Sequence, residues 1–260
     1  MQAKRPEVLI LTATITPPFN VTKLVRKEPQ IRLGDYCETL RFYLGLSSRF
    51  IDRIIFIENS DSDLHSIKEL VETVKHDKKV EIISFPNGND YPPEFGKGYG
   101  EFRMINYALS QSKLLSDRDV LWKVTGRLRV LNIERLIEKA PQNYMIYCDL
   151  RNVPLVGDHF GGNEWMELRL FSFTLEGYNT YFRDKAESLR ESIINESPEQ
   201  YLYKIVKQAL PIETIIPRFT IQPILAGYSG WSNRDYQEWK YSLKDRIRFV
   251  ARHVAPWLWL

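Results

Sequence analysis

Strand signals and helix signals alternate along most of this chain, and this alternation constrains its fold more than any other feature. Short apolar runs predict buried strands over residues 7–15, 51–59, 79–86, 119–126 and 143–150. Amphipathic stretches between these runs predict helices over residues 34–50, 63–77, 100–115 and 132–140. Strands that alternate with helices form parallel sheets covered on both faces. We therefore expect an α/β fold, a single Rossmann-like domain with a mostly parallel central sheet flanked by helices.

After residue 150 the alternation is less regular. Residues 166–182 mix strand and helix character, and residues 212–231 combine strand and turn signals. Residues 197–210 predict a helix, because Ser197 is a good N-cap and Pro198 suits the first helical position. A long polar connection over residues 17–34 separates the first strand from its helix, and connections of this length are usually lids or binding segments.

The chain ends in a basic segment that we expect to be separate from the domain. Residues 240–260 hold five Lys and Arg residues and one acidic residue, so this tail carries +4 and residues 1–239 carry −1. Leu243, Ile247, Val250 and Val254 recur at helical spacing, and two tryptophans follow. This pattern predicts either an interfacial helix in peripheral contact with a membrane or a helix packed on the domain. The nearly neutral domain, residues 1–239, argues against a nucleic-acid partner.

The amino terminus allows two interpretations, a signal peptide or a buried strand. Val8 to Ile15 is a short run that contains two threonines and lacks a small-residue cleavage site, which favours the strand. No segment approaches the roughly 20 apolar residues that span a bilayer. We expect a cytoplasmic protein, either free or peripheral on the inner face of the cell membrane.

Polar side chains follow the predicted strands where a ligand would bind. In an open parallel sheet, ligands lie beyond the carboxyl ends of the strands. Thr12 and Thr14 end the first strand, and Glu58 and Asn59 follow the second. We expect these residues to contact a nucleoside donor, although helix capping explains the acidic segment 58–63 equally well. The Asp-x-Asp spelling at 61–63 is weak and is not expected to bind a metal.

A glycine-rich segment precedes the third long helix. Gly96, Gly98 and Gly100 allow close backbone approach to a ligand, and Lys97 adds a positive charge. The N-terminus of the following helix offers unpaired N–H groups to an anion. The segment therefore predicts a phosphate-binding loop, but only in combination with the next strand.

That strand, within Val120 to Ile133, ends in cations. Lys123, Thr125, Gly126 and Arg127 stand at its carboxyl end, where we expect them to hold a diphosphate. Two cations about 4 Å from a diphosphate each contribute on the order of 4 kcal/mol before desolvation, at an effective dielectric near 20. Alternatively, Lys123 and Arg127 are surface charges or pair with Glu101 or Asp149.

A second small-residue loop lies near the end of the domain. Tyr228, Ser229 and Gly230 combine an aromatic ring with residues that permit close approach. They predict an acceptor or phosphate loop, or an ordinary turn with a core aromatic residue. The four histidines are scattered, so no histidine-based metal site is expected.

Five segments together resemble bacterial glycosyltransferases with a GT-A-like fold, of the kind that act in capsule, O-antigen or exopolysaccharide biosynthesis. They are residues 10–18, 54–63, 96–109, 122–133 and 197–206. The resemblance covers about residues 7–235. Its most specific part is Lys-x-Thr-Gly-Arg at Lys123 to Arg127, preceded by Gly-Lys-Gly at Gly96 to Gly98. Leu128 replaces the aromatic residue expected next. The strand also lacks the Asp-x-Asp motif that holds a divalent ion in much of the fold, which leaves metal dependence open.

The resemblance implies a hexosyltransferase-like enzyme that moves a sugar from a nucleotide-sugar donor to a glycan or lipid-linked glycan acceptor. It implies that the base that deprotonates the acceptor lies in the second half of the domain. Glu199 is the leading candidate, with Glu164, Glu167 and Asp149 as rivals. Glu199 also suits a helix N-terminus, whose dipole would lower its pKa. We expect no cofactor and no metal ligand.

Two other functions remain open from the sequence. One is a non-catalytic nucleotide- or glycan-binding module of the same fold. The other is a nucleotidyltransferase, which needs carboxylates for magnesium at the fourth strand and is disfavoured by their absence.

Overall fold

The central strand of the sheet is β1 (Glu7–Ala13), and all seven of its residues are buried. Burial on both faces explains why this strand is a continuous apolar run, since parallel strands covered by helices do not alternate. The buried-strand interpretation of this run is therefore confirmed. The computed structural model describes residues 7–18, 24–152 and 163–230, together with 233, 235, 236, 246, 248–250 and 254.

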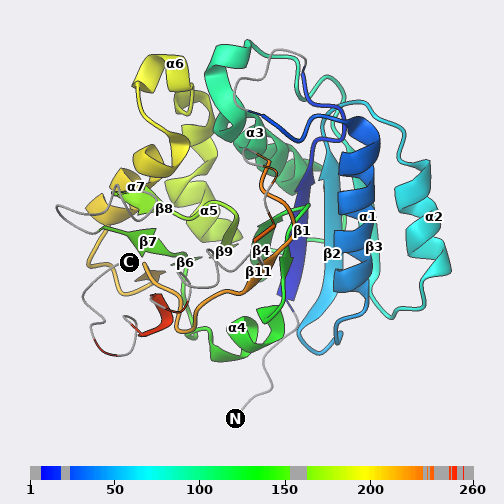
Figure 1. The fold of residues 1–260 in the computed structure, drawn as a ribbon. Coiled ribbons are helices and arrows are strands. Elements are labelled where there is room, and N and C mark those ends of the chain that lie inside the picture. The colour runs from blue at the N-terminus through cyan, green and yellow to red at the C-terminus, as the bar shows by residue number, and fades with distance from the viewer. Residues whose placement is uncertain are drawn as a thin grey trace.

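Seven strands in the described part of the chain form one sheet in the order β10-β6-β9-β4-β1-β2-β3 (Figure 1). Only β9 runs antiparallel to its neighbours β4 and β6. The strands of this sheet are β1, β2 (Ile51–Glu58), β3 (Lys79–Ser84), β4 (Val120–Thr125), β6 (Ile146–Tyr147), β9 (Leu170–Thr174) and β10 (Ile215–Ile216). Two short antiparallel pairs accompany it, β5 (Arg129–Val130) with β11 (Leu225–Ala226) and β7 (Leu150–Arg151) with β8 (Trp165–Met166).

Helices cover both faces of the sheet. The helices are α1 (Pro29–Leu44), α2 (His65–Thr73), α3 (Gly96–Gln111), α4 (Ile133–Lys139), α5 (Leu175–Tyr181), α6 (Glu191–Ile194) and α7 (Pro198–Gln208), with 3₁₀ turns at η1 (Pro93–Phe95) and η3 (Arg183–Ser188). Helices α1, α2 and α4 share one apolar core with Leu9 and Leu11, whereas α3, α5 and α7 share another with Val8 and Ile10. The predicted α/β class, with a mostly parallel central sheet between helices, is confirmed.

Two helices begin earlier than the sequence predicted. Helix α1 starts at Pro29 instead of Gly34, because proline suits a first helical position and its missing N–H costs nothing there. Helix α3 starts at Gly96, so Gly98 and Gly100 lie inside its first turns instead of in a loop. The helix over 197–210 is confirmed, and Ser197 and Gln200 form the reciprocal capping box.

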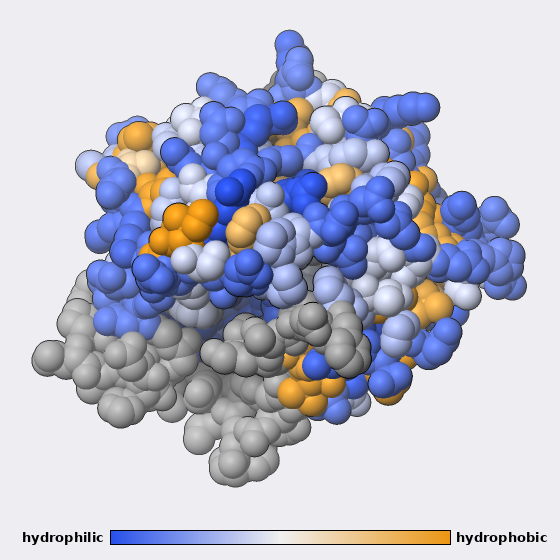
Figure 2. Space-filling view, turned by 90° about the horizontal axis from the view of Figure 1, so that it is seen from above, coloured by the Kyte–Doolittle hydropathy of each residue, from blue (hydrophilic) through white to orange (hydrophobic). Residues whose placement is uncertain are grey.

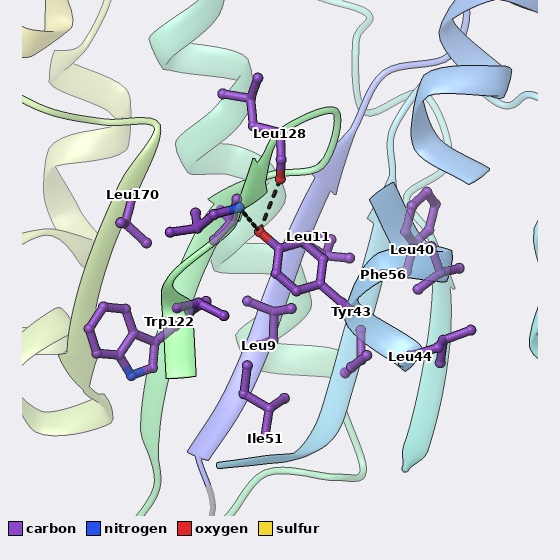
Figure 3. Close-up of a cluster of buried hydrophobic side chains, with 14 of the residues drawn as sticks. Leu9, Leu11, Leu40, Tyr43, Leu44, Ile51, Phe56, Trp122, Leu128 and Leu170 are labelled. Carbon is purple, nitrogen blue, oxygen red and sulfur yellow. Dashed lines mark hydrogen bonds between the residues drawn. The ribbon is translucent and has the colours of Figure 1, made fainter. Parts of the chain in front are cut away.

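One tyrosine ties α1 to the turn that follows β4. The Tyr43 hydroxyl is fully buried, donates to the Leu128 carbonyl at 3.0 Å and accepts from the Val130 N–H at 2.9 Å (Figure 3). Leu128 itself is buried against the same core. The hydrogen bonds of the buried Tyr43 hydroxyl therefore fix the turn that carries Arg127 within an otherwise apolar core.

The predicted basic tail, residues 240–260, lies outside the described residues apart from Arg246, 248–250 and Val254. The division at residue 239 and the placement of Trp257 and Trp259 therefore stay predictions. Among the described residues, no helix combines the length and the apolar character that a membrane crossing requires.

Candidate functional site

A cavity of about 530 Å³ lies at the carboxyl ends of β1, β2 and β4. Its lining includes polar residues at strand ends, as predicted: Thr12 in β1, Thr14 just after β1, Asn59 after β2 and Thr125 in β4. Figure 2 looks onto this end of the sheet and shows mostly hydrophilic residues with smaller hydrophobic areas among them. The parallel strands thus bring polar groups from distant parts of the chain to one site.

Three of the cations that line this cavity come from different elements at one side of it: Arg32 in α1, Lys97 in α3 and Arg127 after β4. Burial and the charges of Arg127 and Arg32 together lower the pKa of Lys97 to about 8, although Glu191 and Glu199 oppose the shift. Burial also lowers the pKa of Arg32, and the positive charge of Arg127 acts in the same direction. Like charges that destabilise one another in a partly buried cavity favour a bound anion.

The two arginines are held in place by backbone carbonyls. Arg32 Nε donates to the Thr14 carbonyl at 2.7 Å, and Arg127 Nη1 donates to the Tyr228 carbonyl at 3.1 Å. Arg32 is missing from the predicted site because the first turn of α1 was assigned to a loop. Its fixed position beside β1 makes it a third candidate contact for an anion.

Lys123 does not line the cavity, contrary to the prediction of a direct diphosphate contact. It is fully buried, and its ammonium donates to Glu101 Oε1 at 2.5 Å, to the Leu168 carbonyl at 2.6 Å and to Thr125 Oγ1 at 3.3 Å. These three partners use all three ammonium donors. The alternative pairing with Glu101 is therefore the correct one, and Lys123 supports the floor of the cavity from beneath.

Glu58 is likewise a supporting residue and not a ligand contact. It is fully buried and does not line the cavity, because its carboxylate accepts hydrogen bonds from the backbone N–H groups of Ile15 and Ser60 at 3.0 and 2.9 Å. It thereby fixes the segments that follow β1 and β2. Its neighbour Asn59 does line the cavity and accepts a hydrogen bond from Thr14 Oγ1 at 2.7 Å.

Gly126 is required by backbone packing. Its N–H donates to the Thr12 carbonyl at 2.9 Å, and a Cβ at this position would lie 2.7 Å from that same oxygen. Gly126 itself does not line the cavity. The glycine lets the turn pass against β1, which brings Arg127 to the cavity.

The predicted small-residue loop lies beside Arg127. Tyr228 and Gly230 line the cavity, whereas Ser229 is buried and does not. A Cβ on Gly230 would lie 2.9 Å from Nη2 of Arg127, so the glycine leaves room for the guanidinium. This position favours the phosphate alternative for the loop over the acceptor alternative.

Glu199 lines the same cavity from the first turn of α7. Its pKa is raised to about 7, mainly by burial, with further contributions from Glu167, Glu101 and Glu191. The sequence predicted the opposite direction from the helix dipole, but desolvation outweighs the backbone at this position. A carboxylate with a pKa near neutrality is suited to accept a proton from a hydroxyl.

The rival carboxylates are less suited to that role. Burial disfavours the charge of Glu167, yet Arg169 and Arg151 hold its pKa well below the usual range. Such a carboxylate stays ionised and is a weak base. Glu164 and Asp149 do not line the cavity.

The residues at the end of β4 do not fit a divalent metal. The resemblance led us to look for an Asp-x-Asp motif at this position, whereas the chain has Thr125, Gly126 and Arg127. Hard divalent cations take oxygen ligands, with carboxylates to balance their charge. The carboxylate of Glu101, which accepts a hydrogen bond from Thr125, is already paired with Lys123. In the described part of the chain, His, Cys, Asp and Glu form no group of three or more that could hold a metal ion.

No protein-family model and no curated protein matches the chain in sequence. It is similar to the solved structure of an inositol-1-phosphate CTP transferase from T. maritima, at 13% identity and a TM-score of 0.45, with 95% of this chain and 97% of that chain covered. It is also similar to the galactosyltransferase LgtC in complex with donor and acceptor sugar analogs, at 8% identity and a TM-score of 0.49, with 92% and 95% covered. HddC from Yersinia pseudotuberculosis is similar at 15% identity and a TM-score of 0.41, with 94% and 99% covered. These similarities extend over nearly the whole of each chain and concern the fold alone.

Proposed function

We propose that the chain is a glycosyltransferase that moves a sugar from a nucleotide-diphosphate donor to a glycan or lipid-linked glycan acceptor in surface polysaccharide synthesis. One observation carries the proposal: Arg32, Lys97 and Arg127 share a cavity at the carboxyl ends of the strands with Glu199, whose pKa is raised to about 7. A cluster of cations suits a diphosphate, and a carboxylate of this pKa suits proton removal from a hydroxyl.

On the donor side, the cations bind the diphosphate and stabilise it as it departs. Negative charge grows on the leaving diphosphate as its bond to the anomeric carbon breaks, so fixed cations act most strongly at that moment. Lys97 is partly neutral at a pKa of about 8, and an adjacent phosphate would favour its charged form. Thr14 and Asn59 offer hydrogen-bonding groups to the nucleoside.

On the acceptor side, Glu199 takes the proton of the attacking hydroxyl. The hydroxyl oxygen forms a bond to the anomeric carbon, the proton passes to the carboxylate, and the electron pair of the broken bond leaves with the diphosphate. Glu101 stands nearby on the cavity floor but is committed to Lys123 and Thr12. Glu101 would therefore hold these side chains in place on the donor side and would not act as the base.

The test is a panel of UDP, GDP, CMP and dTDP in a thermal-shift measurement, followed by turnover with the sugar nucleotides of the base that binds. We expect one nucleotide to raise the melting temperature in the presence of a chelator, and the matching sugar nucleotide to release that nucleotide when acceptor is supplied. A binding module would show the shift but no release with any sugar nucleotide. Absence of a shift with every nucleotide would overturn the proposal.

A further inference from the structure

A second charged group lines the cavity apart from the three donor-side cations. It consists of Arg151 at the end of β7, Glu167 after β8 and Arg169 before β9, all of which line the cavity. Glu167 Oε2 accepts from Arg151 Nη2 at 2.7 Å, and Glu167 Oε1 accepts from Arg169 Nε at 2.6 Å. One carboxylate faces two guanidinium groups, so the group keeps one excess positive charge.

Arg151 is the member of this group with a free donor. The residue is 7% exposed, and its buried Nε has no hydrogen-bond partner among the described residues. Buried charged donors are almost always paired, so an unpaired donor on a residue that lines a cavity indicates a position for a ligand acceptor atom.

An aromatic residue stands directly opposite Arg151. In the β7–β8 pair, Arg151 is in register with Trp165, and side chains at paired positions lie on the same face. Trp165 is only partly buried and lines the cavity. An indole face beside a guanidinium is a combination that binds a sugar ring with an attached anion.

Glu199 interacts electrostatically with both charged groups of the cavity. Its charge acts on Lys97, and the charge of Glu167 acts on Glu199 in turn. Glu199 lines the cavity together with both charged groups, and its helix α7 packs against β8. In the proposed transfer, the acceptor hydroxyl lies between the base and the anomeric carbon, so the acceptor sugar must bind beside Glu199.

We propose that Arg151 and Trp165 form an acceptor subsite for a sugar that carries an anionic group, either a carboxylate or a phosphate. This inference rests on the proposed glycosyltransferase function. Trp165 stacks on the ring, and the Arg151 guanidinium donates an N–H to the anion. The donor-side cations do not take part, so acceptor charge and donor affinity are separable.

The experiment measures sugar binding by calorimetry to the full chain saturated with its preferred nucleoside diphosphate. The probes are methyl glucoside and methyl galactoside, the matching methyl glucuronide and galacturonide, and the two hexose 1-phosphates. We expect an anionic probe to bind about tenfold more tightly than its neutral partner, which corresponds to one charge-assisted hydrogen bond. The uronides and the hexose phosphates distinguish a carboxylate from a phosphate.

Substitution then assigns the preference to Arg151. R151Q should abolish the preference for the anion, R151K should keep part of it, and nucleotide affinity should not change in either variant. R53Q is the matched control, because Arg53 pairs with Asp119 at 2.6 Å in a half-buried position that does not line the cavity. It reports the cost of breaking a similar pair without touching the subsite.

Three results would overturn the inference: equal affinity for anionic and neutral probes, no sugar binding by the nucleotide-saturated wild type, or an anion preference that survives in R151Q. If R151Q fails to fold, the affinities of the wild type for anionic and neutral probes still test the inference. Loss of nucleotide binding in the wild type would instead refute the proposed function, so the two failures are distinguishable.

Discussion

At the scale of single residues, the protonation of Glu199 is decided by two opposed effects. The N-terminus of α7 favours the charged carboxylate, and burial disfavours it. Because the pKa rises to about 7, burial is the stronger effect. Neighbouring carboxylates act in the same direction as burial. The residue is therefore half ionised at neutral pH, which is the condition in which a base can both take and release a proton.

Glu199→Gln should lower turnover by roughly 10²- to 10⁴-fold, because the glutamine amide cannot accept the proton. Nucleotide affinity should not change. In the wild type, turnover should rise with pH through about 7, as the carboxylate ionises, and this rising limb should be absent from the residual activity of the variant. Steady-state kinetics from pH 5 to 9 with calorimetry of nucleotide binding would measure both. A wild-type rate that is flat across pH 7 would exclude Glu199 as the base.

The same shift in pKa predicts an effect on stability. A carboxyl group whose pKa is raised on folding stabilises the folded state fully below its unfolded pKa, near 4.5, and this contribution is lost as pH rises through about 7. The wild type should therefore lose on the order of 1–3 kcal/mol relative to Glu199→Gln between these limits. Urea unfolding of both proteins at pH 5 and pH 8 would measure the difference.

Arg127→Ala should weaken binding of the preferred nucleoside diphosphate by about 10- to 100-fold, as expected for loss of a charged hydrogen-bond donor. Arg129→Ala is the control, because Arg129 lies two residues further along, pairs with Glu38 and does not line the cavity. Equal affinities of the two variants, measured by calorimetry, would refute a role for Arg127 in phosphate binding.

At the scale of elements, the contact between α3 and α7 sets the distance between Lys97 and Glu199. Gly98 lies against Pro198, and a Cβ at Gly98 would approach the Pro198 ring carbons to 2.3 and 2.4 Å. Two helix N-termini that each carry a functional side chain are thus brought together by a glycine and a proline. The glycine-rich segment therefore allows close helix packing and does not form a free loop.

Gly98→Ala should push the first turns of α3 and α7 apart and lower stability by about 1–3 kcal/mol, as overpacking does. Turnover should fall as well, because the base and the cation cluster would separate. Gly34→Ala is the control, since no atom lies within 4 Å of a Cβ there and an alanine inside α1 should stabilise by about 0.5–1 kcal/mol. Thermal unfolding and turnover that are the same in both variants would contradict this role of Gly98.

The elements of the first half of the chain could be predicted because their signals are long and periodic. The strands up to β4 are apolar runs of six to eight residues that are bounded by polar turns. The strands β6, β7, β8, β10 and β11 have two residues each, which is too short for any period to be visible. The start of α1 was missed although Pro29 marks it.

At the scale of the whole molecule, the sheet determines which predicted residues meet. Strand ends could be predicted to converge, and Thr12, Thr14, Asn59 and Arg127 do line one cavity. Arg32 and Arg151 could not be predicted, because only tertiary packing brings α1 and the β7–β8 pair to the same place. The role of Lys123 could not be predicted either. Packing brings Glu101 of the adjacent helix to Lys123, and the two side chains form an ion pair.

The most direct test of the site is a calorimetric titration of the wild-type chain with the preferred nucleoside diphosphate, once with chelator and once with manganese or magnesium. If Arg32, Lys97 and Arg127 neutralise the diphosphate, binding should be equally tight under both conditions and should weaken as salt is raised. Binding that requires the added metal would contradict a diphosphate site built from cationic side chains.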